Sequence, residues 1–139
     1  MPDSKKMPRT SSPIHALRTL IVEDEALIAL ETSVHLDEWN HEVVGIATSR
    51  RQALAIASRE ARIDVALVDV NLAYGEDGVE LARTLKQDFG INVIFVTGFS
   101  DEVSRQRMQS VGPIACLFKP YEPAHLERVL AEAFGPVEA

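Results

Sequence analysis

The sequence predicts an open α/β fold, a doubly wound parallel sheet of five strands with helices on both faces. Short apolar runs rich in β-branched residues recur along the chain, each too short for a buried helix. Segments with helical spacing separate these runs, which indicates βαβ units with right-handed crossovers. The expected strands are residues 18–23, 41–47, 64–69, 92–97 and 114–118.

Five helices are expected between and after these strands. Their predicted ranges are residues 25–38, 50–61, 78–89, 101–111 and a segment that starts near Pro123. In the first of them, Leu27, Leu30 and Val34 follow the spacing i, i+3, i+7. This spacing predicts that these three side chains face the core.

The third helix has the clearest end signals. Asp77 with Glu80 three residues later is typical of an N-cap, and Gly90 is typical of the left-handed residue that ends a helix. Phe89 is expected in its buried face. The helix at 101–111 has few apolar residues, so its packing is expected to be weak.

The bulk composition fits one globular domain. The chain has 139 residues, of which 46% are hydrophobic and 25% are charged. Residues 1–16 contain three prolines and several cations, so we expect a disordered leader there. Residues 17–135 are expected to form the domain, and residues 136–139 a C-terminal tail too short to hold an output domain.

Charge and cysteine content limit the possible partners and compartment. The net charge of −7 argues against binding to nucleic acid, which depends on Lys and Arg neutralising phosphates. A single cysteine, Cys116, cannot form a disulfide within the chain. No apolar run reaches the length of a membrane span and no signal peptide is evident. We therefore expect a cytoplasmic protein without membrane contact.

Reactive polar residues stand where four of the predicted strands end. Glu23 and Asp24 follow the first strand, Asp69 ends the third, Thr97 ends the fourth and Lys119 follows the fifth. Ligands bind at the carboxyl edge of open α/β sheets, so these side chains are expected to meet in one crevice.

Three carboxylates in one crevice would repel each other unless a cation shares the site. Mg²⁺ prefers carboxylate, carbonyl and water oxygens, and no His or Cys accompanies these acids. The candidate direct ligands are Asp24, Asp69 and the backbone carbonyl of Asn71, whereas Glu23 is expected to act through a water.

The same residues suit phosphoryl transfer. A carboxylate such as Asp69 can act as a nucleophile and form an acyl phosphate. The Lys119 ammonium and the Thr97 hydroxyl could meet the phosphoryl oxygens. The Lys119–Pro120 bond is a candidate for the cis isomer.

These motifs, in this order, resemble the response-regulator receiver domains of bacterial two-component signalling. The resemblance covers about residues 17–135 and implies a flavodoxin-like fold with strand order 2-1-3-4-5. It implies that Asp69 accepts a phosphoryl group and that Glu23 and Asp24 form the acidic magnesium pair. It also implies that Thr97 is the switch hydroxyl and that Lys119 is the phosphate-binding amine. It further implies a histidine kinase or a histidine phosphotransfer protein as the donor. Apart from self-phosphorylation and dephosphorylation at Asp69, no enzyme activity is expected.

One position departs from the family pattern. Receivers usually carry Tyr or Phe three residues before the lysine, and here Cys116 stands there. The run from Phe95 to Phe99 resembles a receiver subgroup, often stand-alone, with a Phe-X-Thr-Gly-aromatic motif. We therefore expect Phe99 or Tyr121 to supply the moving aromatic of the switch, together with Thr97. Residues 98–111 are the expected mobile element, and the helix 101–111, the strand 114–118 and the last helix form the expected surface for a downstream partner.

Three alternatives remain open at this level. A pseudo-receiver would bind partners without phosphorylation, but it should lack an acid or the lysine. A haloacid-dehalogenase-like phosphatase would need an acid two residues after its nucleophile, where Asn71 stands. A flavodoxin-like cofactor binder would need a phosphate loop after the first strand, where Glu23 and Asp24 would repel phosphate.

Overall fold

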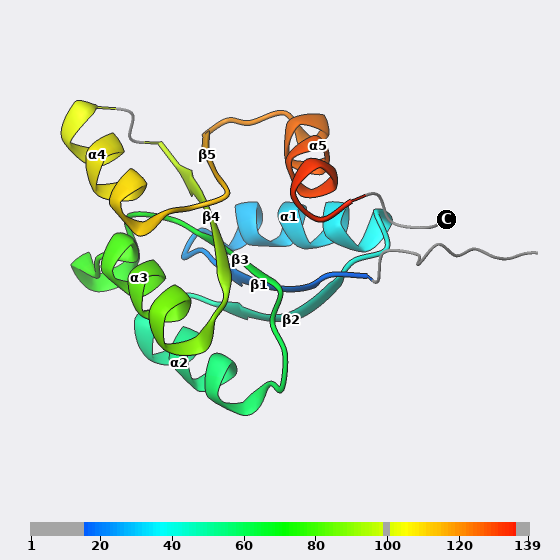
Figure 1. The fold of residues 1–139 in the computed structure, drawn as a ribbon, viewed down its shortest axis with the longest axis horizontal. Helices are drawn as coiled ribbons and strands as arrows, with labels where there is room; N and C mark the ends of the chain where they lie inside the picture. The colour runs from blue at the N-terminus through cyan, green and yellow to red at the C-terminus, as the bar shows by residue number, and fades with distance from the viewer. Residues whose placement is uncertain (1–15, 99–100, 136–139) are drawn as a thin grey trace, which may run out of the picture.

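The computed structural model describes residues 16–98 and 101–135. Its strands form one parallel sheet in the order β2-β1-β3-β4-β5 (Figure 1). They are β1 (Arg18–Val22), β2 (Glu42–Ala47), β3 (Val65–Val68), β4 (Asn92–Thr97) and β5 (Ala115–Phe118). The predicted fold class and strand order are therefore confirmed. The expected leader and tail fall almost wholly on residues 1–15 and 136–139, outside the described residues.

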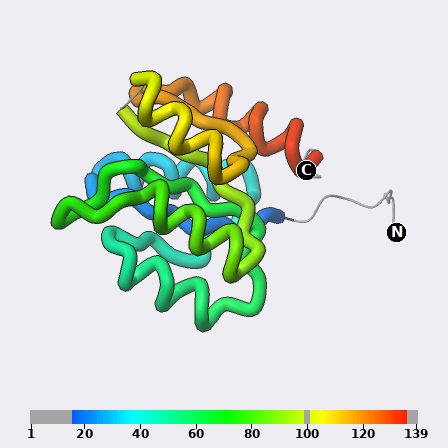
Figure 2. The backbone as a smooth tube through the Cα atoms, turned by 60° about the vertical axis from the view of Figure 1, so that its left-hand side comes forward, coloured from blue at the N-terminus to red at the C-terminus, as the bar shows by residue number. Residues whose placement is uncertain are grey.

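Helices cover both faces of the sheet. They are α1 (Ala26–Glu38), α2 (Arg50–Arg59), α3 (Gly78–Phe89), α4 (Glu102–Val111) and α5 (Pro123–Phe134), with a short 3-10 turn η1 (Ala73–Gly75) before α3. The helices α1 and α5 lie on one face, and α2, α3 and α4 lie on the other (Figures 1 and 2). Within the described ranges, no helix has both the length and the apolar character needed to cross a membrane.

The central strands divide their side chains between two apolar clusters. In β4, Val93 and Phe95 pack with α2, α3 and α4, whereas Ile94 and Val96 pack with α1 and α5. This alternation is the period of a strand buried on both faces. The sheet therefore lies between the two helical layers. Because its strands are parallel, their carboxyl ends lie at one edge of the sheet.

The predicted buried face of α1 is wrong. Leu27, Leu30 and Val34 are exposed, and the buried residues of α1 are instead Ala29, Thr32 and Leu36. Helical spacing identifies residues that share a stripe, but it does not decide which stripe faces the sheet. The stripe that faces the sheet here carries Ala29 and Leu36, which join the apolar cluster under α1 and α5.

The predicted ends of α3 are confirmed. The Asp77 side chain accepts hydrogen bonds from the N–H groups of Val79 and Glu80, and Gly90 has left-handed backbone with φ of 69°. The expected burial of Phe89, however, is wrong, because 38% of this residue is exposed.

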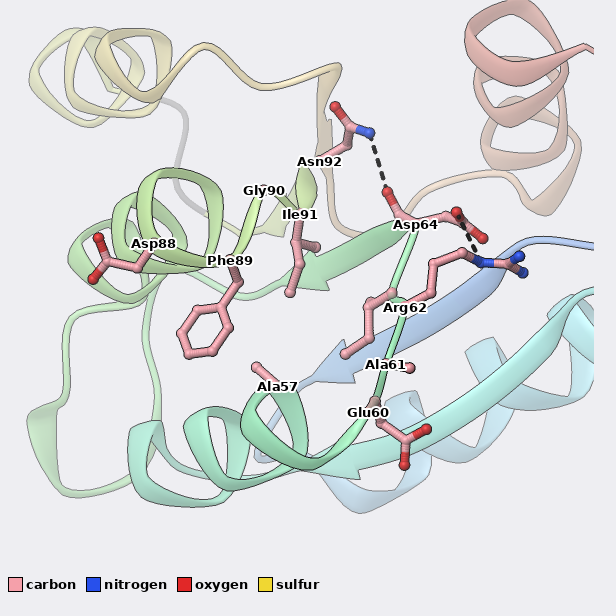
Figure 3. A pocket seen from close by; sticks show the side chains of 11 residues that line it. Ala57, Glu60, Ala61, Arg62, Asp64, Asp88, Phe89, Gly90, Ile91 and Asn92 are labelled. Atoms are coloured by element: carbon pink, nitrogen blue, oxygen red, sulfur yellow. Dashed lines mark hydrogen bonds and ion pairs between the residues drawn. The ribbon is translucent and has the colours of Figure 1, made fainter.

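Phe89 lies instead at the rim of a hollow at the amino ends of β3 and β4. The hollow has a volume of about 460 Å³, and Figure 3 shows its lining. Its Asp64 is already paired with Arg62 at 3.4 Å. This hollow opens at the sheet edge opposite the ends that carry the predicted site residues.

Candidate functional site

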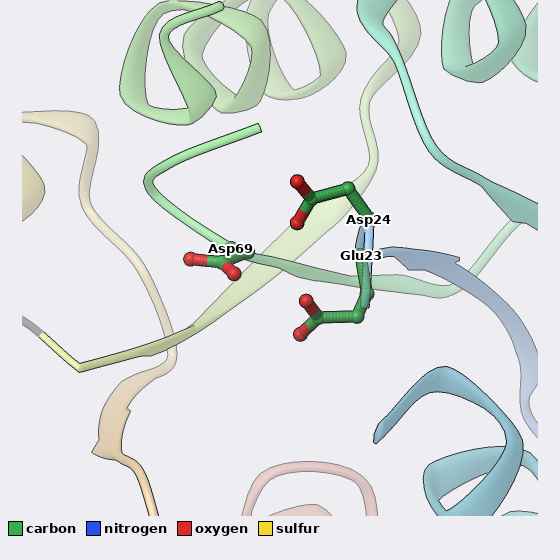
Figure 4. Close-up of side chains that lie close together, drawn as sticks. All are labelled: Glu23, Asp24 and Asp69. Atoms are coloured by element: carbon green, nitrogen blue, oxygen red, sulfur yellow. The ribbon is translucent and has the colours of Figure 1, made fainter. Parts of the chain in front are cut away.

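The three predicted acids meet at the carboxyl ends of the neighbouring strands β1 and β3 (Figure 4). One carboxylate oxygen from each of Glu23, Asp24 and Asp69 lies within 4.8 Å of the others. Main-chain hydrogen bonds fix their position, because the Asp69 N–H donates to Val22 O at 3.0 Å and the Glu23 N–H to Ala47 O at 2.9 Å. Glu23 and Asp69 are buried, whereas Asp24 is exposed at the mouth.

This donor set suits a hard divalent cation. The clustered donors are carboxylates without His or Cys, which is the chemistry that Mg²⁺ prefers. The exposed position of Asp24 also leaves one side of the cluster open to water, and Mg²⁺ usually keeps several of its waters.

Lys119 reaches the acids from the end of β5. Its Nζ lies 2.8 Å from Glu23 Oε1, 2.9 Å from Asp69 Oδ2 and 3.4 Å from Glu25 Oε1. Burial opposes the charged ammonium, but the hydrogen bonds to Glu23 and Asp69 outweigh it, so the pKa of Lys119 lies above its usual range. The Lys119 ammonium therefore forms ion pairs with three carboxylates.

The carboxyl group of Glu23 is buried. Burial raises the pKa of Glu23 above its ordinary value, although hydrogen bonds from Lys119 and from the Glu25 N–H oppose the increase. The Glu25 N–H donates to Glu23 Oε2 at 3.1 Å and so orients this carboxylate. Glu23 thus depends on Lys119 for its charge compensation.

The loop after β3 holds the remaining oxygen of Asp69. Its Oδ1 accepts the Asn71 N–H at 3.1 Å, while its Oδ2 faces the lysine. The loop is closed by an antiparallel bridge between Asn71 and Asp77 and by the Gly78 N–H, which donates to Val70 O at 2.7 Å. A Cβ on Gly78 would lie 1.8 Å from Asp69 O, so α3 starts in direct contact with the main chain of Asp69.

The structure also places Thr97 and the Lys119–Pro120 turn at this edge. Thr97 is buried at the end of β4, and its carbonyl accepts the Lys119 N–H at 2.8 Å. The Lys119–Pro120 peptide bond is cis, as the sequence suggested. Thr97 and Lys119 are therefore adjacent through the main chain of two paired strands.

Of the two expected switch aromatics, the structure describes Tyr121. Phe99 lies outside the described residues. The Tyr121 hydroxyl is 2.9 Å from Thr32 Oγ1 on α1, and its ring packs with the cluster under α1 and α5. Cys116 occupies the usual aromatic position on β5 as a half-buried residue, with the Gln109 amide 4.0 Å from its sulfur. Burial raises the pKa of both the Tyr121 phenol and the Cys116 thiol.

Sequence reasoning missed two contributors to the site. Glu25 contacts Lys119, and its position directly after the acidic pair was the available signal. Gly78 is the first residue of the predicted helix 78–89, and no contact with the site was predicted for it. Its packing against Asp69 could not be read from the chain, because the contact depends on how the loop 70–77 folds back.

Fold and site together define a class of protein, an open α/β domain with an acidic cluster and a lysine at the carboxyl edge of its sheet. The family model described as the response regulator receiver domain matches residues 19–131. The chain belongs to the response regulator receiver domain family.

Individual relatives agree with this assignment. The chain is 33% identical over 119 residues to the phyllosphere-induced regulator PhyR of Methylorubrum extorquens, covering 85% of this chain and 43% of that protein. It is 30% identical to the transcriptional regulatory protein PdtaR of Mycobacterium tuberculosis, over 78% of this chain and 52% of that protein. The chain thus spans about half the length of the curated relatives it matches.

A solved structure shows the same fold. The signal receiver domain of a modulated diguanylate cyclase from Desulfovibrio desulfuricans G20 superposes with a TM-score of 0.78 and 33% identity, covering 86% of this chain and 94% of that one. Membership of this family decides against the dehalogenase-like and flavodoxin-like alternatives.

Proposed function

We propose that this chain accepts a phosphoryl group on Asp69 and changes a partner-binding surface in response. The observation that carries the proposal is the direct contact between Lys119 and Asp69 beside two further acids. A pseudo-receiver would lack an acid or the lysine, and here both are present and in contact.

Phosphoryl transfer to Asp69 depends more on positioning the carboxylate and the phosphoryl group than on activating the nucleophile. A carboxylate oxygen of Asp69 attacks the phosphorus, and the phosphorus–nitrogen bond of a phosphohistidine breaks with its electron pair passing to the imidazole nitrogen. The Asn71 N–H and the Lys119 ammonium hold the two Asp69 oxygens in place before the reaction. Lys119 and the Thr97 hydroxyl are then the proposed contacts of the transferred phosphoryl oxygens.

A magnesium ion completes the proposed site. Asp24, Asp69 and the Asn71 carbonyl would bind it directly, and Glu23 would bind through a water. When bound, the ion supplies positive charge that offsets the negative charge of the phosphoryl oxygens. Without it, a phosphoryl group would enter a site that holds three carboxylates and one ammonium.

The donor in this proposal is a histidine kinase or a histidine phosphotransfer protein. The output is a downstream protein that binds the face formed by α4, β5 and α5, with α4 as the element that moves. Two exposed apolar residues support this face, Val103 on α4 and Phe118 on β5, with the Arg105 guanidinium 6.0 Å from the Phe118 ring. Beyond gaining and losing its own phosphoryl group, the chain catalyses no reaction in this proposal.

The test is phosphorylation by a small donor. The wild type is incubated with acetyl phosphate and magnesium chloride, and its intact mass is recorded. We expect one phosphoryl adduct, lost in Asp69→Asn and lost when magnesium is chelated. Asp88→Asn is the matched control, because Asp88 is an exposed acid that lines the hollow at the opposite sheet edge. A wild type without an adduct, or an Asp69→Asn variant with the same adduct, would refute the proposal.

A further inference from the structure

Arg107 of α4 extends toward the first turn of α3. Its guanidinium forms an ion pair with Asp77 through Nη2 and lies 3.9 Å from a Glu80 carboxylate oxygen. Asp77 is the N-cap of α3 and precedes the glycine that contacts Asp69. The arginine therefore binds the end of the acceptor loop.

The two oxygens of Asp77 have separate partners. Oδ1 accepts the N–H groups of Val79 and Glu80 at 2.9 Å and 3.4 Å, and this caps α3. Oδ2 faces Arg107. The Asp77 carboxylate thus joins α4 to the start of α3. The main chain of Asp77 also pairs with Asn71, which lies two residues after Asp69.

Other contacts between α3 and α4 lie further along these helices, away from the start of α3. Arg83 donates to Ser110 Oγ at 3.1 Å, and Lys86 donates to the Gly112 carbonyl at 2.6 Å. These contacts hold the carboxyl end of α4 and do not involve the acceptor loop. Among the described residues, the Arg107–Asp77 pair is the side-chain ion pair that ties α4 to that loop.

We propose that Arg107 is a positioning residue that couples the acceptor loop 70–77 to α4 through Asp77. The proposal rests on phosphorylation of Asp69 for its signalling role, but the coupling itself exists in the unphosphorylated protein. A shift of the Asp69 main chain moves Gly78, because Gly78 is in contact with it, and so moves the adjacent Asp77. Arg107 then transmits the movement to the middle of α4. The route uses no aromatic switch, and in this chain the usual aromatic position is Cys116.

The test measures backbone hydrogen exchange in the full chain. Arg107→Gln removes the charge, and Asp77→Asn removes the opposite charge while keeping a good N-cap. Because an exposed ion pair contributes only modestly to stability, we expect a modest effect. Exchange in both α4 and the loop 70–77 should become about two- to fivefold faster in either variant. Arg107→Lys should restore part of the protection. Arg105→Gln is the matched control, because this arginine of α4 faces β5.

A double-mutant cycle distinguishes coupling from two local effects. The double variant should exchange no faster than either single variant, because the same contact is lost in each. Additive effects, or an Arg107→Gln variant that leaves the loop 70–77 unchanged, would overturn the proposal.

A second arm separates this inference from the proposed function. Exchange is recorded with and without acetyl phosphate and magnesium, while intact mass reports the adduct. In Arg107→Gln the adduct should still form, but the phosphorylation-dependent change in α4 should fall to less than about half of the wild-type change. If the wild type forms no adduct, the proposed function fails and the first arm alone decides the coupling. An adduct with an undiminished α4 response in Arg107→Gln would refute the signalling role.

Discussion

The contact between Gly78 and Asp69 leads to a prediction that runs against helix propensity. Gly78 is the first residue of α3 and its φ is not in the left-handed region. Alanine is about 1 kcal/mol better than glycine inside a helix, so propensity alone predicts that Gly78→Ala stabilises the protein. The tertiary contact predicts the opposite sign.

The magnitude follows from the atoms that the new methyl group meets. An added Cβ would lie 1.8 Å from Asp69 O, 2.8 Å from Asp69 C and 2.9 Å from Val70 Cα. All three are main-chain atoms, so no side-chain rotation relieves the overlap. The start of α3 must move away from β3 until the shortest separation exceeds 3.0 Å. Overpacking of this kind costs about 1–3 kcal/mol, and we expect the upper end of that range.

Urea unfolding at constant m-value measures this loss directly. Gly98→Ala is the matched control, because its added Cβ has no heavy atom within 4 Å and we expect a change of less than about 0.5 kcal/mol. The displaced loop should also slow adduct formation at Asp69. Equal stability of the two variants, or a more stable Gly78→Ala protein, would refute the packing argument.

Three further predictions concern the metal, a buried histidine and a buried tyrosine. Magnesium chloride at ten times its Kd should add about 1.4 kcal/mol to the free energy of unfolding and raise the melting temperature by a few degrees. The gain is measured relative to sodium chloride at equal ionic strength, and Asp24→Asn should lose most of it. Burial lowers the pKa of His41, so its contribution to the free energy of unfolding should be complete above about pH 6.5 and fall as the pH drops below that value. The fall should be shallower in His41→Asn but not in the exposed control His125→Asn. Tyr121→Phe removes the hydrogen bond to Thr32 and should cost about 1 kcal/mol in urea unfolding; an unchanged midpoint would show that the bond contributes no stability.

The grouping of the site residues could be predicted because strand geometry is simple. Parallel strands in one sheet bring their carboxyl ends to one edge, so Asp69, Thr97 and Lys119 had to be neighbours once the strands were recognised. The periodicity of the apolar runs was strong enough to place each strand within about one residue.

The face of α1 could not be predicted for an equally simple reason. Leu27, Leu30 and Val34 form an apolar stripe, but Ala29 and Leu36 lie on another stripe of the same helix, and that second stripe packs on the sheet. Choosing between them requires knowledge of the side chains that the sheet presents. The contacts of Glu25 with Lys119 and of Arg107 with Asp77 depend in the same way on side-chain reach across elements.

These contacts suggest how charge and main-chain packing combine in the proposed switch. Lys119 now divides its ammonium among Glu23, Glu25 and Asp69. A phosphoryl group on Asp69 adds close to two negative charges, so it would draw Lys119 toward itself and weaken the contacts with the two glutamates. Because the Lys119 N–H is bonded to the Thr97 carbonyl, this shift would act on the ends of β4 and β5 together. If the same event also displaces the Asp69 main chain, which contacts Gly78, the proposed signal would have two routes, one through β5 and one through the acceptor loop to α4.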